Sequence, residues 1–125
     1  MINFSSLIKE SNEVYNAIKR TFRVSNRDIN QLIRIAKNNN NGKVRLCSHL
    51  NQKEAVHEMF IVHPKGTYVR PHKHLKKAES MVVIEGKVDY LIFNNNGKIR
   101  KIINMGDYQS GNPFYQSTDA NTYHG

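Results

Sequence analysis

Two histidines one residue apart, a following glutamate and a glycine at each end make residues 66–86 the segment that most constrains the fold. It reads GTYVRPHKHLKKAESMVVIEG. Alternate side chains of an extended strand point to the same face, so His72 and His74 are predicted to share one space. The short connection after them lets Glu79 approach from the neighbouring strand or bend.

Two imidazoles and one carboxylate suit a divalent metal ion and leave positions open for water or substrate. Zinc, iron, nickel and manganese all accept mixed nitrogen and oxygen ligands, so the sequence does not select among them. One further ligand is wanted, and His124 is the candidate, although a histidine near a chain end is often simply exposed. The sequence predicts a metal site formed by His72, His74, Glu79 and His124.

The spacing G-x5-H-x-H-x4-E-x6-G over residues 66–86 resembles the first motif of the cupin superfamily. The surroundings resemble one branch, the WbuC-type cupin-fold metalloproteins. The segments that carry this resemblance are residues 45–50, 56–80, 83–99 and 123–125. In the second cupin motif, Gly106 and Asp107 match the opening, and the late histidine of the WbuC form corresponds to His124.

The resemblance implies a mainly β fold, the cupin double-stranded β-helix (a small β-barrel or jelly roll), with one N-terminal α-helix. Residues 1–42 would form a strand and helix extension packed on the barrel, and residues 43–125 the barrel itself, within a single structural domain. The family continues past its late histidine with another strand, whereas this sequence stops at Gly125, so a truncated barrel or a weaker site is expected. The residual edge strand near the N-terminus would offer a dimer surface, so a homodimer is expected.

The residues themselves predict one helix and a series of strands. Ser25 is an N-cap with Asp28 three residues on, and an apolar stripe at helical spacing follows, which predicts a helix over residues 25–38. Alternating or continuous apolar patterns predict strands over residues 13–18, from residue 43 onward, and over residues 56–63, 67–74, 80–85, 87–93 and 98–104. The run at 80–85 is expected to be buried on both faces, and Asn-Gly within residues 94–97 predicts a hairpin turn.

Five further residues are candidates for substrate binding or proton transfer at the metal site. Arg45 and Arg70 could anchor an anionic ligand group through paired N–H donors, whereas Glu58, Tyr68 and His49 are candidates for proton transfer. In an ordinary sandwich Arg45 and His49 would face solvent, and in a cupin barrel they would point toward the metal. Glu58 shares its strand face with apolar residues, so it is expected to cap an edge or to pair with a ligand or with an arginine such as Arg70.

Composition limits the classes of partner. With 125 residues the chain suits one domain, and it has no stretch long enough for a membrane span and no signal-peptide pattern. Its single cysteine fits a reducing compartment, so a cytoplasmic location is the default expectation. The net charge of +9 arises from 19 dispersed Lys and Arg residues without a nucleic-acid-binding signature. This pattern disfavours nucleic acid and favours an anionic small molecule as ligand.

The resemblance implies a metal-binding cupin that acts on a sugar or nucleotide-sugar in surface-polysaccharide (O-antigen) metabolism. The alternative is a non-catalytic, metal-containing module that binds or senses a small molecule. Both hypotheses use the same residues, and no residue in the sequence selects isomerisation, oxidation or hydrolysis. A nucleic-acid-binding domain is the third, disfavoured hypothesis.

Overall fold

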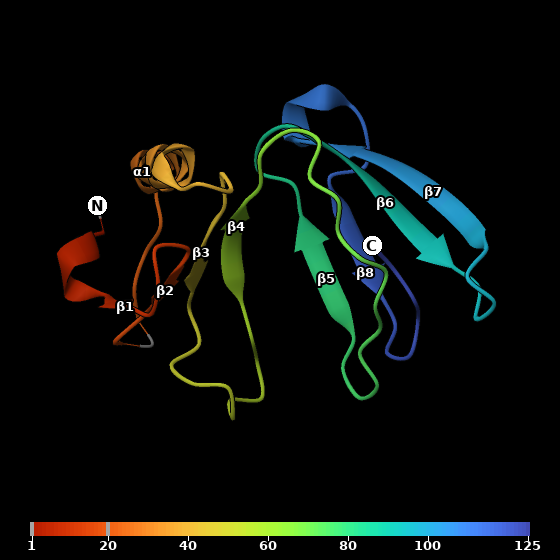
Figure 1. Cartoon of the computed structure of the whole chain (residues 1–125), viewed down its shortest axis with the longest axis horizontal. Helices are drawn as coiled ribbons and strands as arrows, with labels where there is room; N and C mark the ends of the chain where they lie inside the picture. Colours follow the sequence, from red (N-terminus) through yellow and green to blue (C-terminus); the bar gives the residue numbers. More distant parts are fainter. Residues whose placement is uncertain (1, 20) are drawn as a thin grey trace. The chain divides into compact units, whose positions relative to one another are not determined.

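The computed structural model describes residues 2–19 and 21–125 and divides into two compact units, Met1–Thr67 and Tyr68–Gly125 (Figure 1). The chain is mainly β-structure with one α-helix among the described residues, and none of the sheets formed by these residues closes into a barrel. None of the helices described is both long enough and apolar enough to cross a membrane. The division predicted at residue 42 stays a prediction.

The first unit combines one four-stranded sheet with the α-helix. The sheet has the order β1-β2-β3-β4, in which β2 and β3 run parallel and the other neighbours run antiparallel. The strand predicted at residues 13–18 is confirmed by β2, and the one predicted at 56–63 is shortened to β4. The elements are η1 (Phe4–Ser6), β1 (Ile8–Lys9), β2 (Val14–Asn16), α1 (Asn26–Asn38), β3 (Val44–Cys47) and β4 (Met59–Val62).

The helix α1 begins as predicted, with Ser25 as its N-cap. The buried Asp28 carboxylate accepts hydrogen bonds from the Ser25 backbone N–H and hydroxyl, both at 2.7 Å, and from the Ile2 N–H. These bonds satisfy polar groups that a helix start would otherwise leave without partners. The apolar face of α1 packs on β3, where Leu32 lies in one buried cluster with Leu46.

The second unit contains two antiparallel strand pairs, β5 with β8 and β6 with β7. β6 and β7 form the long hairpin in Figure 1, joined by the predicted Asn-Gly turn, in which Gly97 has a φ of 84° that favours glycine. The strand predicted at residues 87–93 is confirmed by β6. The elements are β5 (Glu79–Val82), β6 (Lys87–Phe93), β7 (Ile99–Gly106), η2 (Tyr108–Ser110) and β8 (Tyr115–Thr118).

The core of the second unit forms from the inward side chains of β6 and β7 and the residue after β5. Tyr90, Ile92, Met105 and Val83 are buried together in it. The chain end adds to this structure, because residues 123–125 pair with the backbone of β6. This cluster and the paired chain end form the support on which the candidate site is built.

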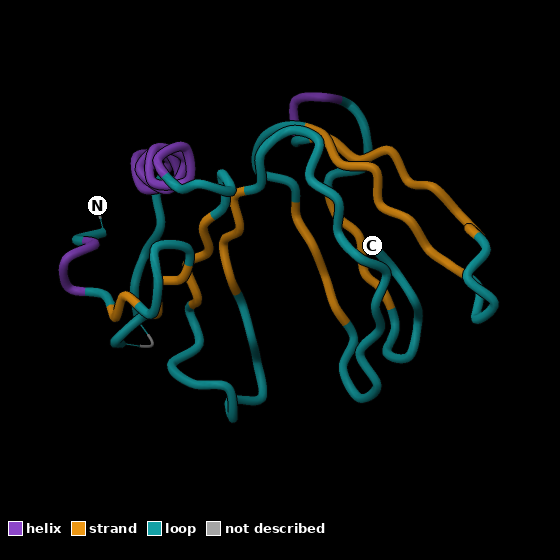
Figure 2. The backbone as a smooth tube through the Cα atoms, in the orientation of Figure 1, coloured by secondary structure: helices purple, strands orange, loops and turns teal. Residues whose placement is uncertain are grey.

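The strand predicted at residues 67–74 is wrong. The backbone from residue 67 to residue 78 runs as loop and turn (Figure 2), apart from an isolated bridge between His72 and His124. Pro71 has no N–H to donate to a ladder, which limits pairing in this stretch. The two glycines that bracket the motif, Gly66 and Gly86, have φ angles of 82° and 92° and so form turns that favour glycine.

The expectation that residues 80–85 are buried on both faces is also wrong. Only residues 79–82 form a strand, and Val82 and Ile84 are 56% and 55% exposed, while Val83 between them is buried. The continuous apolar run therefore conceals an ordinary alternation of one inward and one outward face.

Candidate metal centre

Four side chains from three segments of the second unit converge at one place. His72 and His74 lie on the loop before β5, Glu79 is the first residue of β5, and His124 lies in the segment paired with β6. One ligand atom from each of the four lies within 4.8 Å of the others, so the group could hold a metal ion. The four residues named from the sequence thus lie together.

The backbone holds His124 firmly although it is next to the end of the sequence. Its N–H donates to the carbonyl of His72 and its carbonyl accepts from the N–H of His72, both at 2.9 Å. Gly125 exchanges a similar pair of bonds with Leu91, at 2.8 and 3.0 Å. Fraying, which is expected of a chain end that is not tied down, is therefore opposed on both edges of this segment.

Hydrogen bonds to the backbone orient two of the imidazoles. Nδ1 of His72 lies 2.9 Å from the carbonyl oxygen of Arg70, and Nδ1 of His124 lies 2.9 Å from the carbonyl oxygen of Thr122. A carbonyl only accepts, so each Nδ1 carries the proton and donates it. In a neutral ring this arrangement leaves Nε2 as the atom with a free lone pair.

The Glu79 carboxylate contacts two of the imidazoles, those of His74 and His124. Its Oε2 atom lies 2.7 Å from Nε2 of His74 and 3.1 Å from Nε2 of His124. The side chain of His124 is only 3% exposed, whereas those of His74 and Glu79 are 46% and 38% exposed. The group therefore has a buried wall and a side that is open to solvent.

Tyr90 forms part of the buried wall, and the sequence analysis did not single it out. Its ring lies nearly parallel to the imidazole of His124, at 12° and 5.7 Å between centroids, and its hydroxyl lies 2.7 Å from the Thr118 hydroxyl. Burial raises the pKa of Tyr90, the Thr118 hydrogen bond opposes this, and the Glu79 charge adds to the rise, so the phenol is neutral. The sequence signal that could have identified Tyr90 is its position among apolar residues that alternate along a predicted strand.

The other candidates from the sequence lie in different surroundings. Tyr68 and Arg70 belong to the unit that contains the four-residue group, and both side chains are exposed. Arg45, His49 and Glu58 belong to the other unit. Within it, the side chains of Arg45 and Glu58 are exposed and that of His49 is buried.

His49 has its own contacts in the first unit. Its Nδ1 atom lies 3.3 Å from the backbone carbonyl oxygen of Glu58, and its ring stacks on that of His57 at 4.3 Å between centroids. His63 is exposed, yet partial desolvation and the nearby charges of Lys43 and Arg45 lower its pKa. His49, His57 and His63 are not among the four clustered residues that could hold a metal ion.

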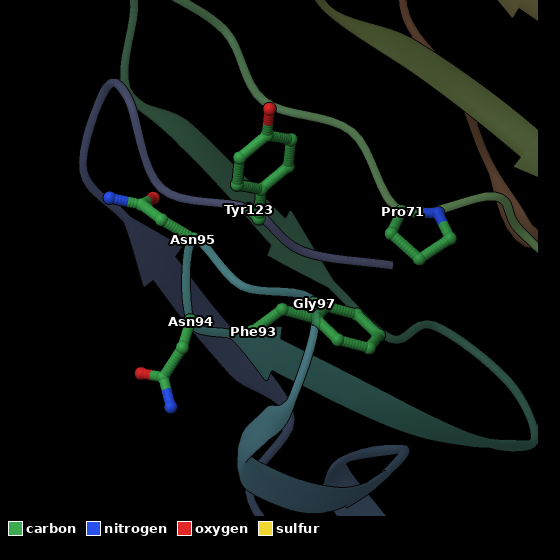
Figure 3. Close-up of a pocket in the computed structure, with 6 residues that line it drawn as sticks. All are labelled: Pro71, Phe93, Asn94, Asn95, Gly97 and Tyr123. Carbon is green, nitrogen blue, oxygen red and sulfur yellow. The ribbon is translucent and has the colours of Figure 1, made fainter.

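A small pocket of about 170 Å³ lies in the second unit, lined by residues that neighbour the centre in sequence. Figure 3 shows its three rings, those of Pro71, Phe93 and Tyr123. Pro71 and Tyr123 directly precede His72 and His124, and the Lys73 ammonium lies 4.6 Å from the centre of the Tyr123 ring. None of the four clustered residues lines this pocket; Asn94, Asn95 and Gly97 complete it.

A known protein family matches part of the chain. The family described as a domain of unknown function (DUF6016) matches residues 24–105, which is more than half of the chain. No curated protein and no solved structure gives a significant match. The matched region includes His72, His74 and Glu79 and ends before His124.

Proposed function

The chain belongs to the DUF6016 family, and we propose that it is a metal-binding cupin of the WbuC type. In this proposal His72, His74, Glu79 and His124 hold a divalent ion. The single observation that carries the proposal is that one ligand atom of each lies within 4.8 Å of the other three. The cupin barrel is part of the proposal on the strength of the resemblance of residues 45–125 alone, because the sheets of the described residues do not close.

The chemistry of the donor atoms fits a cation. His124 donates from Nδ1 to Thr122, so a neutral ring would face the Glu79 carboxylate with the lone pair of Nε2 at only 3.1 Å. At this distance the lone pair of Nε2 and the carboxylate oxygen repel each other unless a positive charge lies between them. That charge is either a second proton on the ring or a metal ion. Three imidazoles with one carboxylate are a ligand set that zinc, iron, nickel and manganese accept.

A bound divalent ion would supply a Lewis acid and lower the pKa of a coordinated water. The residues of the chain would bind and orient the substrate. Arg70, exposed in the same unit, offers paired N–H donors to an anionic group, and Tyr68 offers a hydroxyl. Lys73, Lys76 and Lys77 flank His74 in sequence and add positive charge that attracts anions.

The substrate class in this proposal is a sugar or nucleotide-sugar of surface-polysaccharide metabolism. Its support is the resemblance of residues 45–125 to WbuC-type cupins, together with the net charge of +9, which suits an anionic sugar. The homodimer also belongs to the proposal and is checked by light scattering during gel filtration. A screen of sugars and nucleotide-sugars with metal-loaded and metal-free protein separates turnover from binding without turnover.

Elemental analysis of the purified protein tests the metal centre. The wild-type chain is expected to carry stoichiometric metal, and the double variant His72→Ala/His74→Ala is expected to carry none. His63→Ala is the matched control, because it removes an exposed imidazole that lies outside the group. Equal metal content in the wild type and the double variant would refute the assigned ligands.

A further inference from the structure

Tyr90 is a polar side chain in an otherwise apolar row. It shares the inward face of β6 with the buried Ile92 and is only 5% exposed. Its core neighbours are Val83, Ile92 and Met105, which offer no polar atoms. A phenol costs free energy in such a position unless its hydroxyl finds a partner, so a phenylalanine would be the simpler core residue.

The partner of the Tyr90 hydroxyl comes from another strand. Thr118, the last residue of β8, is itself buried, and its hydroxyl lies 2.7 Å from that of Tyr90. The bond fixes the far end of the phenol while β6 fixes the near end. The two strands therefore fix the long axis of the ring, and the buried side chains around it restrict its rotation about that axis.

The fixed ring lies against a single member of the four-residue group. The rings of Tyr90 and His124 are 5.7 Å apart between centroids and tilted by only 12°, a parallel arrangement. On its own segment, His124 is restrained by the bond from Nδ1 to the Thr122 carbonyl. Together the stack and this bond direct Nε2 toward Glu79.

We propose that Tyr90, held by Thr118, is a positioning residue for the metal centre and sets the orientation of the His124 imidazole. This inference rests on the proposed metal-binding function. It adds residues that orient a ligand without binding the ion themselves. Removing groups that hydrogen-bond to metal ligands and orient them typically lowers metal affinity by about 10- to 100-fold, and a ring that orients a ligand by stacking is expected at the lower end of that range. The competing explanation is that Tyr90 only fills space in the core.

Cobalt(II) titration in competition with a coloured chelator distinguishes these explanations, since it yields an affinity and a visible spectrum. Tyr90→Leu removes the ring, and we expect cobalt affinity to fall by about tenfold with an altered ligand-field spectrum. Tyr90→Phe retains the stacked ring but loses the bond to Thr118, so its affinity should lie between those of the wild type and Tyr90→Leu. Thr118→Val should resemble Tyr90→Phe, and combining the two should add no further loss, because both remove the same hydrogen bond.

Met105→Ala is the matched control. It opens the same core but removes neither an aromatic ring nor a hydrogen-bonding group, so its affinity and spectrum should match those of the wild type. An unchanged affinity and spectrum in Tyr90→Leu, or an equal loss in Met105→Ala, would overturn the positioning role while leaving the metal site intact. Failure of the wild-type protein to bind cobalt would instead refute the metal-binding function, and the inference with it.

Discussion

The Nε2 atom of His124 lies 3.1 Å from Oε2 of Glu79, while Nδ1 of the same ring is 2.9 Å from the carbonyl oxygen of Thr122. One nitrogen is therefore committed to the backbone and the other faces a carboxylate. The ring is buried, its Nδ1 contacts the Thr122 carbonyl and its face stacks on Tyr90, so it cannot easily turn away from this contact. A cation, whether a proton or a metal ion, removes the repulsion between the two acceptors.

Glu79→Gln should separate metal binding from stability. The side-chain amide of glutamine can donate an N–H to Nε2 of His124, so the metal-free variant should unfold at the same or a slightly higher temperature. The loss of the charged ligand should lower zinc affinity by at least about tenfold. Thermal denaturation and zinc titration measure the two effects, with the exposed Glu85→Gln as control. Unaltered zinc affinity in Glu79→Gln would contradict the role given to this carboxylate.

Acidification should release the metal. Imidazoles bind metals in the neutral form, so protons compete with the ion at His72, His74 and His124. We expect zinc affinity to fall steadily between about pH 8 and about pH 5, the range in which histidines usually titrate. Equilibrium dialysis at a series of pH values measures this, and an affinity independent of pH over that range would count against imidazole ligands.

Asp28 should make the first unit sensitive to acid. Burial alone raises its pKa, but the hydrogen bonds from Ser25 and Ile2 outweigh this effect and hold the pKa below its ordinary value of 3.8. A carboxylate with a lowered folded pKa stabilises the protein fully above the unfolded pKa. The contribution is lost as the pH falls through the folded pKa.

Asp28→Asn tests this contribution, which should be about 1 kcal/mol at neutral pH, as for other helix N-terminal contacts. Urea unfolding at neutral pH and at progressively lower pH should show the difference from wild type shrinking as the pH falls below 3.8. The exposed Asp119→Asn should leave stability nearly unchanged. A difference between Asp28→Asn and wild type that stays constant down to strongly acidic pH would contradict the lowered pKa.

Cys47 should be unreactive in the folded protein. Its side chain is buried, and this burial raises the pKa of the thiol, an effect that the nearby Arg45 only partly opposes. Because the thiolate is the reactive form, a disulfide reagent should modify Cys47 slowly in the native state and rapidly in denaturant. Equal rates under the two conditions would show that the thiol is accessible.

The sequence predicted those elements whose signals are local. The capping residues Ser25 and Asp28 predicted the start of α1, and Asn-Gly with alternating apolar residues predicted the β6–β7 hairpin. The spacing of His72, His74 and Glu79 predicted that these side chains lie together, and they do. Each of these signals depends on a few neighbouring residues.

Other features depended on contacts between distant segments and could not be read from local patterns. The residues around Pro71 alternate in a way that is typical of a strand. Their pairing is nevertheless limited to one isolated bridge, which joins His72 to the distant His124. Val82 lies between the partly buried Met81 and the buried Val83, yet it is itself 56% exposed. Tyr90 and Thr118 lie 28 positions apart, so their bond and its effect on His124 appear only once the strands are placed.

X-ray absorption spectroscopy of the zinc-loaded protein tests the central claim most directly, because it reports the atoms around the ion. The account predicts nitrogen and oxygen ligands at about 2.0–2.2 Å, with the scattering of three imidazoles in the wild type and of two in His124→Ala. A sulfur ligand, or an imidazole signal that does not change in His124→Ala, would contradict it.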